Sequence, residues 1–183
     1  MRAADVSSDI TEVLVTEEQI RAKLDEIAGR VAADYDGKDL LLVGVLKGAV
    51  MVMADFARAL PALVPMDWMA VSSYGAGTKS SGVVQIRKDL DTDILGKHVL
   101  IVEDIIDSGL TLSWLLENFA ARGAASVEVF ALLRKPDAAK VEVDCKYVGF
   151  DIPNEFVIGY GLDYAEQYRN LRDVAILAPH VYS

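Results

Sequence analysis

Apolar residues in the first third of the chain change from a helical spacing to an unbroken run. Between residues 16 and 33 they recur every three or four positions, as on one face of a helix: Ile20, Leu24, Ile27 and Val31. Thr16 and Gln19, at the start of this stripe, have the spacing of a capping box. Residues 40–46 are all apolar or glycine, which is typical of a short strand buried on both faces. Residues 49–60 predict a second helix, which ends at Pro61.

The rest of the chain repeats this alternation. Strand composition recurs at residues 67–74, 82–87, 99–102, 126–133, 147–152 and 174–177. A further helix is predicted by the i, i+3, i+4, i+7 spacing of Leu112, Leu115, Leu116 and Phe119, with Gly123 as its stop. Strands that alternate with helices predict an α/β fold, in which helices flank a central, mostly parallel sheet.

Two segments lack the apolar residues that would anchor them. Residues 75–81 are all small or polar, and we expect a moving loop there. Its composition fits a lid over a site and an idle hairpin tip equally well. Residues 1–11 contain acids and no apolar stretch of the kind found in signal peptides, so we expect a short frayed arm.

Composition narrows the class of function. The chain has 183 residues, enough for one domain with a full core, and its net charge of −10 comes without any Lys/Arg cluster. A nucleic-acid partner is therefore not expected. No apolar stretch reaches the ~18 residues of a membrane span. The single cysteine, Cys145, excludes an internal disulfide, fits a cytosolic protein and is expected as a small buried residue. These features favour a small-molecule enzyme.

The candidate chemistry lies where residues 99–111 pass from a strand to a helix. Ligands of open α/β sheets bind at the carboxyl ends of strands, and this strand is followed by two adjacent acids, Glu103 and Asp104. Backbone N–H groups of residues 107–111, at a helix N-terminus, suit a phosphate, and the acids suit sugar hydroxyls or a metal. A phosphorylated sugar would satisfy both halves. The residues alone fit a second interpretation equally well. In it the two acids only solvate a strand end, and Asp107 caps the next helix.

Residues 102–111 resemble the signature that binds 5-phosphoribosyl-1-pyrophosphate (PRPP) in the purine phosphoribosyltransferases. That signature is two hydrophobic residues, Glu-Asp, two hydrophobic residues, Asp-Ser/Thr-Gly, any residue and Thr. Further segments are similar to the hypoxanthine–guanine branch and occur in the same order: residues 45–48, 73–74, 133–136, 148–153 and 156–164, with Arg169 beyond. The resemblance covers roughly residues 10–178. It implies a type I phosphoribosyltransferase fold, with a core of about residues 35–140, a small hood lobe from about residues 10–20 and 141–183, and a lid loop of about residues 73–88.

The resemblance also implies a purine salvage reaction and the groups that bind PRPP. The 5-phosphoribosyl group would move from PRPP to N9 of hypoxanthine or guanine, giving IMP or GMP and pyrophosphate, with Mg²⁺ as cofactor. Asp107 would be the catalytic base that takes the proton from N7. The implied PRPP-binding residues are Glu103, Asp104, Asp107, Ser108, Gly109, Leu110, Thr111, Leu46, Lys47, Gly48 and Arg169. The implied metal ligands are Glu103, Asp104 and Asp163.

For the purine, the resemblance implies Lys135, Phe156, Val157 and Asp163. Lys135 would donate to the purine O6, so that adenine would leave a buried donor unpaired at a cost of ~1–3 kcal/mol. Phe156 would stack on the base, and Val157 would offer its backbone to the base edge. Ser73 and Tyr74 would belong to the lid. In the family the peptide before the Lys47 position is commonly cis. Leu110 departs from relatives that carry a lysine there, and a homodimer or homotetramer is implied, with the apolar helix of residues 49–60 as one candidate interface.

Three alternatives compete with this interpretation. A xanthine-preferring transferase keeps the fold and changes the base, and the residues do not exclude it. A PRPP-sensing regulator that binds nucleic acid is disfavoured by the net charge of −10 and by the presence of Asp107, Lys135, Asp163 and Arg169. A dinucleotide-binding Rossmann protein is disfavoured because no GxGxxG follows residues 40–46.

Overall fold

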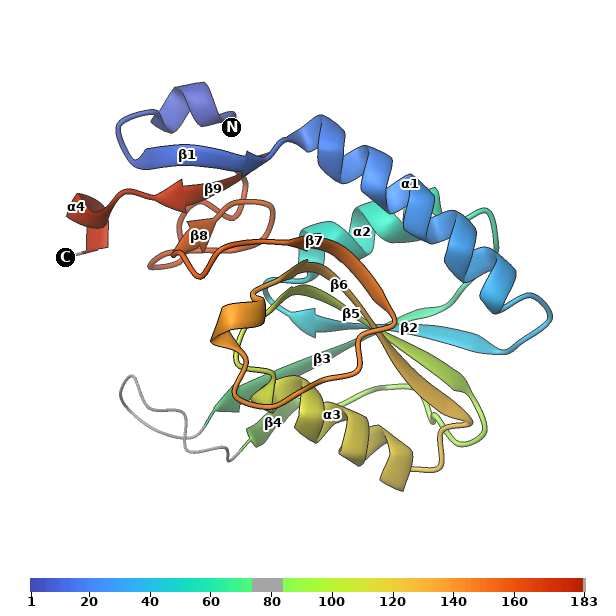
Figure 1. The fold of residues 1–183 in the computed structure, drawn as a ribbon. Coiled ribbons are helices and arrows are strands. Elements are labelled where there is room, and N and C mark those ends of the chain that lie inside the picture. Colours follow the sequence, from blue (N-terminus) through green and yellow to red (C-terminus); the bar gives the residue numbers. More distant parts are fainter. Residues whose placement is uncertain (74–83, 183) are drawn as a thin grey trace.

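The computed structural model describes residues 1–73 and 84–182, and these residues form two sheets (Figure 1). The main sheet has six strands in the order β4-β3-β2-β5-β6-β7, parallel except for β4 at one edge. Its strands are β2 (Leu40–Leu46), β3 (Met66–Ser73), β4 (Val84–Lys88), β5 (His98–Ile106), β6 (Ser126–Arg134) and β7 (Tyr147–Asp151). The second sheet is antiparallel, in the order β1-β9-β8, and comprises β1 (Ile10–Val15), β9 (Val174–Leu177) and β8 (Val157–Ile158).

Helices cover both faces of the main sheet. The helices α1 (Glu17–Asp34) and α2 (Val50–Ala59) lie on one face and α3 (Leu110–Ala121) on the other (Figure 1). Because successive strand residues point to opposite faces, Leu100 and Val102 of β5 enter the core under α1 and α2, whereas Val99 and Ile101 enter the core under α3. Three short elements complete the chain: the 3₁₀ helices Ala3–Val6 and Pro136–Ala138, and α4 (Pro179–Tyr182). The predicted α/β class with a mostly parallel sheet flanked by helices is confirmed.

Local sequence signals account for the start of α1. Thr16 Oγ1 accepts the N–H of Gln19, and the Gln19 side chain accepts the N–H of Thr16, at 3.3 and 2.8 Å. This reciprocal pair is the predicted capping box. The apolar stripe behind it, Ile20, Leu24, Ile27 and Val31, is buried against the sheet. None of the helices in the described ranges is long and apolar enough to cross a bilayer.

The central strand β5 is longer than predicted, and this changes how its acids are held. Pairing with β6 continues through Glu103, Ile105 and Ile106, which lie opposite Ala131, Leu133 and Arg134. The two acids therefore lie inside the strand, and the expectation that they follow it is wrong. A ladder with a neighbouring strand fixes them more firmly than a turn would.

The chain ends also differ from expectation. The prediction of a frayed arm at residues 1–11 is wrong. Ile10 of β1 pairs with Leu177 of β9, and the N–H of Ala3 donates to the Asp173 carboxylate at 3.3 Å. The sheet β1-β9-β8, together with the loops that join its strands, is called the hood below. Figure 1 shows the hood beyond the carboxyl ends of the parallel strands. The expected boundary near residue 140 would put β7 in the hood, but β7 pairs with β6 in the main sheet. Cys145 is only half buried, with Sγ 3.2 Å from the carbonyl oxygen of Tyr147.

Candidate active site

The candidate site begins at the carboxyl end of β5, next to the turn that leads into α3. Glu103 is only 8% exposed and lines a hollow of about 170 Å³ on the α3 side of the sheet. The turn and the first turn of α3 form the rest of the lining: Ile105, Ile106, Asp107, Ser108, Gly109, Thr111 and Leu112. Because the first N–H groups of a helix have no partner inside it, this hollow can receive an anion.

The turn before α3 depends on Gly109. Its φ of 79° lies in the left-handed region, and a Cβ there would meet the carbonyl oxygen of Val141 at 2.6 Å. The glycine therefore lets the turn pack against residues 140–143, where the carbonyl of Ser108 accepts the N–H of Lys140 at 3.0 Å. Gly109, not Asp107, is the residue before the first helical turn, and no side chain caps it. The helix-cap alternative for Asp107 is therefore wrong, and its exposed carboxylate is not held by the helix.

Asp104 points to the other face of the sheet, against the turn after β2. A Cβ on Gly48 would lie 1.8 Å from Asp104 Oδ2, so any larger residue there would displace the Asp104 carboxylate. On the opposite side, a Cβ on Gly161 of the hood would lie 2.0 Å from the carbonyl oxygen of Gly48. The Leu46-Lys47 peptide in the same turn is cis. The ends of β2 and β5 and one loop of the hood thus meet at Gly48.

The two acids have an unfavourable electrostatic environment. Burial, followed by the neighbouring charge of Asp104, raises the pKa of Glu103 well above its usual range. Burial also raises the pKa of Asp104 to about 6, although N–H bonds and Arg169 oppose the shift. Carboxylates that are this costly to ionise favour a cation or hydroxyl donors beside them.

Two cations, Arg169 of the hood and Lys47 of the turn after β2, lie on the Asp104 side of the site, and both are bound by carboxylates. Arg169 Nη2 lies 2.7 Å from Asp163 Oδ1 and 3.1 Å from Glu166 Oε1, and Arg169 Nη1 donates to the carbonyl of Gly161 at 2.7 Å. Lys47 Nζ lies 2.8 Å from Glu166 Oε2. The hood thus brings Arg169 and Asp163 to the turn that carries Lys47.

A third group of side chains follows β6 and precedes β8. Lys135 is 8% exposed, and no described residue accepts a bond from its ε-ammonium group. Phe156 is 41% exposed; its ring stacks on Tyr182 with centroids 5.1 Å apart and meets Tyr164 edge-on at 5.8 Å. Val157, the next residue, begins β8 and pairs with Ile176. A buried ammonium group can bond a polar group of a ligand, and an exposed aromatic ring can stack on a flat one.

Comparison with known proteins agrees with this geometry. A family model described as a phosphoribosyl transferase domain matches residues 12–165. The chain belongs to this phosphoribosyltransferase family. It is 56% identical over 180 residues to the hypoxanthine-guanine phosphoribosyltransferase of Mycobacterium tuberculosis (strain ATCC 25618 / H37Rv), covering 95% of this chain and 89% of the relative. It is 49% identical over 174 residues to that of Bacillus subtilis (strain 168), covering 95% and 97%.

Solved structures give the same result. A crystal structure of a hypoxanthine phosphoribosyltransferase from Staphylococcus aureus superposes with a TM-score of 0.95 at 46% identity, covering 98% of this chain and 97% of that one. The resemblance drawn from residues 102–111 is therefore confirmed at the level of the family.

In this phosphoribosyltransferase the predicted residues fall into the three groups described above. Glu103 and most of residues 107–111 line the β5–α3 hollow. Asp104 lies against the turn of residues 46–48, which also meets the hood that carries Arg169 and Asp163. Lys135 follows β6. The resemblance implies Asp163 for both the purine and the metal, and in the structure Asp163 pairs with Arg169. Ser73 ends β3, whereas Tyr74 and most of the expected lid lie outside the described residues.

Three residues at the site were missed from the sequence. Gly161 and Glu166 lie within or beside the matched segment of residues 156–164, and the close contact of Gly161 needs the folded hood to be seen. Glu166 could have been suspected from its position three residues before Arg169. Tyr182 gave no signal, because its contact with Phe156 joins two ends of the hood.

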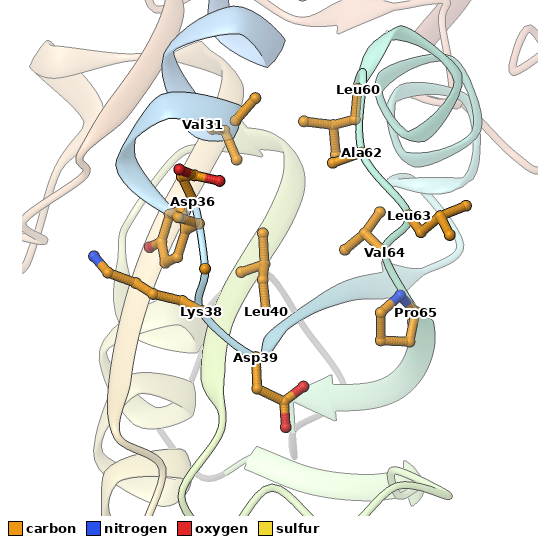
Figure 2. A pocket seen from close by; sticks show the side chains of 13 residues that line it. Val31, Asp36, Lys38, Asp39, Leu40, Leu60, Ala62, Leu63, Val64 and Pro65 are labelled. Atoms are coloured by element: carbon orange, nitrogen blue, oxygen red, sulfur yellow. The ribbon is translucent and has the colours of Figure 1, made fainter.

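A second hollow, of about 240 Å³, lies at the opposite end of the main sheet, where β2 and β3 begin (Figure 2). Its lining includes the apolar side chains of Leu40, Leu60 and Val64. None of the predicted site residues lines it. In α/β sheets the carboxyl ends of the strands, not the amino ends, form the ligand site, so this hollow is not the active site.

Proposed function

We propose that the chain is a Mg²⁺-dependent hypoxanthine–guanine phosphoribosyltransferase of purine salvage. It transfers the 5-phosphoribosyl group of PRPP to N9 of a 6-oxopurine and releases pyrophosphate. The observation that carries the proposal is the β5–α3 segment, which places the buried acid Glu103 in a hollow of phosphate size and its neighbour Asp104 on the other face of the strand. A sugar phosphate needs both halves, and the high identity to hypoxanthine-guanine phosphoribosyltransferases supports this substrate.

The PRPP subsites follow from the charges in the site. The N–H groups and hydroxyls of residues 107–111 bind the 5′-phosphate, without help from a lysine at Leu110. Glu103 and Asp104 accept bonds from the ribose hydroxyls. Lys47 and Arg169 bind the pyrophosphate, and the backbone of Leu46 and Gly48 lies beside it. This assignment is supported by the convergence of Lys47, Arg169 and Gly48 on one turn.

The described residues fit Mg²⁺ that arrives with the substrate. They contain no group of three or more His, Cys, Asp or Glu side chains that could hold a metal by itself. Mg²⁺ is ordinarily held by one or two carboxylates together with water and substrate phosphates. Asp104, with its raised pKa, and Asp163 would be its protein ligands, and Glu103 would face the ribose. When bound there, Mg²⁺ neutralises charge that develops on the departing pyrophosphate.

The purine subsite uses the third group. Lys135 donates to O6, Phe156 stacks on the base, and the backbone of Val157 binds the base edge. The exposed carboxylate of Asp107 takes the proton from N7 as N9 attacks the anomeric carbon. The buried acids stabilise the positive charge that develops on the ribose ring. We also expect a cytosolic homodimer or homotetramer; the large apolar side chains of α2 pack mainly into the core of this chain, and Val50 is the one that is exposed.

The test is an absorbance assay with PRPP and Mg²⁺, in which hypoxanthine, guanine, xanthine and adenine are offered separately. We expect turnover of hypoxanthine or guanine and none of adenine. Asp107→Asn should slow turnover by about 10²–10⁴-fold, and Asp137→Asn, which removes an exposed carboxylate outside the site, should not. A preference for xanthine would favour the alternative base. Absence of turnover with every purine would refute the proposed function.

A further inference from the structure

Glu166 is a hood residue to which the family resemblance assigns no role, yet it contacts both cations of the site. Its Oε2 lies 2.8 Å from Lys47 Nζ, and its Oε1 lies 3.1 Å from Arg169 Nη2. Lys47 belongs to the turn after β2 and Arg169 to the hood, so one carboxylate joins the two parts of the site. Its N–H also donates to Asp163 Oδ2 at 2.9 Å.

The backbone holds Glu166 in this position. Ala165, Glu166 and Tyr168 have φ values of 50°, 62° and 71°, a left-handed conformation that non-glycine residues rarely adopt. Reciprocal bonds between Tyr164 and Gln167, at 3.2 and 2.9 Å, close the turn. A turn that puts consecutive non-glycine residues in this conformation presents the Glu166 side chain to Lys47 and Arg169 from a defined position.

The carboxylate–cation contacts are nevertheless exchangeable. The side chains of Lys47 and Glu166 are 65% and 63% exposed, so water competes for both of them. Arg169 still has an unused donor, because its Nε is buried without a described acceptor. An anion with several charged oxygens would offer these cations more acceptors than one carboxylate does.

We propose that Glu166 is an internal anion that occupies the pyrophosphate subsite of the empty enzyme and is displaced when pyrophosphate or the pyrophosphate group of PRPP binds. The inference rests on the proposed function. Two cations that converge on one carboxylate form a binding site for a polyanion, and Glu166 competes for that site. Glu166 therefore weakens pyrophosphate binding and favours release of the product.

A purely structural role for Glu166 predicts the opposite change in pyrophosphate affinity when Glu166 is replaced. If its contacts with Lys47 and Arg169 served to hold the hood against the core, their loss would loosen the site and weaken ligand binding. If Glu166 competes with the ligand, their loss strengthens pyrophosphate binding. The two roles can therefore be separated by the direction of one change in affinity.

The experiment compares the full-length wild type, Glu166→Gln and the control Glu117→Gln by titration calorimetry with inorganic pyrophosphate and MgCl₂. Glu117 is an exposed glutamate of α3 with no described hydrogen bond or ion pair, so its variant removes the same charge elsewhere. Since exposed ion pairs are weak, we expect Glu166→Gln to bind pyrophosphate about two- to tenfold more tightly. Binding of IMP, which has no pyrophosphate group, should stay unchanged in all three proteins.

Unchanged or weaker pyrophosphate binding by Glu166→Gln would overturn the proposal, as would equal tightening by Glu117→Gln. If the wild type turns over hypoxanthine while the affinity fails to change in the expected direction, only the role of Glu166 falls. If the wild type neither binds pyrophosphate nor turns over a purine, the proposed function falls and the role of Glu166 falls with it.

Discussion

Replacing Asp104 by asparagine should stabilise the unliganded protein near neutral pH while removing its activity. Burial raises the pKa of Asp104 from an ordinary value of 3.8 to about 6. The folded state therefore binds this proton more tightly than the unfolded state does. The resulting stabilisation is fully present below about pH 4 and is lost as pH rises through about 6. Above that pH the folded wild type carries a buried charge that asparagine lacks.

The size of the effect follows from the pKa difference. Values of about 6 and 3.8 differ by roughly two pKa units, and each unit corresponds to about 1.36 kcal/mol, so the gain in unfolding free energy at pH 8 is at most about 3 kcal/mol. At pH 5 the same linkage leaves about half of it. An asparagine oxygen can still accept the N–H of Ile105, which Asp104 Oδ1 accepts at 2.8 Å, so that bond is kept.

Urea unfolding of the wild type and Asp104→Asn at pH 5, 6.5 and 8, without Mg²⁺ or ligand, measures this gain. Asp25→Asn, which changes an exposed acid of α1, serves as the control and should show no comparable gain. The kcat/KM for PRPP should fall in Asp104→Asn because the ribose and metal lose their carboxylate. The reasoning is refuted if Asp104→Asn is less stable than the wild type at pH 8, or if its gain does not shrink at pH 5.

Three further predictions test other parts of the structure, two of them with a matched control variant. Gly48→Ala puts a methyl group 1.8 Å from Asp104 Oδ2 and should cost about 1–3 kcal/mol in urea unfolding. Gly29→Ala, a matched change in α1 with nothing within 4 Å, should instead stabilise by about 0.5–1 kcal/mol. Asp67→Asn should lower thermal stability by about 1–3 kcal/mol, since the buried carboxylate accepts the N–H groups of residues 68, 91 and 92. Tyr182→Ala should raise the KM for the purine about two- to tenfold without changing that for PRPP, and Tyr182→Phe should not.

The parts of the fold that were predictable have local causes. The helix α1 was predicted because its capping box and apolar stripe lie within consecutive turns, and β2 because a run of apolar residues must be buried on both faces. The end of β5 could not be predicted, because two charged residues after an apolar run look like the end of a strand. Only the ladder with β6 shows that the strand continues. The same applies to β8, whose two residues form a strand only by pairing with β9.

At the site, the residues in one continuous segment were predictable and the contacts between segments were not. Residues 103–111 carry their chemistry in sequence order, so their type and spacing suggested a sugar phosphate. The fit of Gly48 between Asp104 and Gly161 joins three segments that are far apart in the chain. Periodicity and composition describe neighbours along the chain, so they contain no information about such a contact.

The charges of the site's own residues leave two unfavourable features that one ligand can relieve together. Asp104 is an acid with a raised pKa, and no cation among the described residues is bonded to it, while Lys47 and Arg169 are paired with the protein's own carboxylates. A free metal ion would help Asp104 and leave the cations as they are. A metal-free polyanion would bind the cations but would add negative charge beside Asp104. Only a polyanion that arrives with its divalent cation improves both sides. Because such coupling is reciprocal, Mg²⁺ should strengthen pyrophosphate binding by the same factor by which pyrophosphate strengthens Mg²⁺ binding.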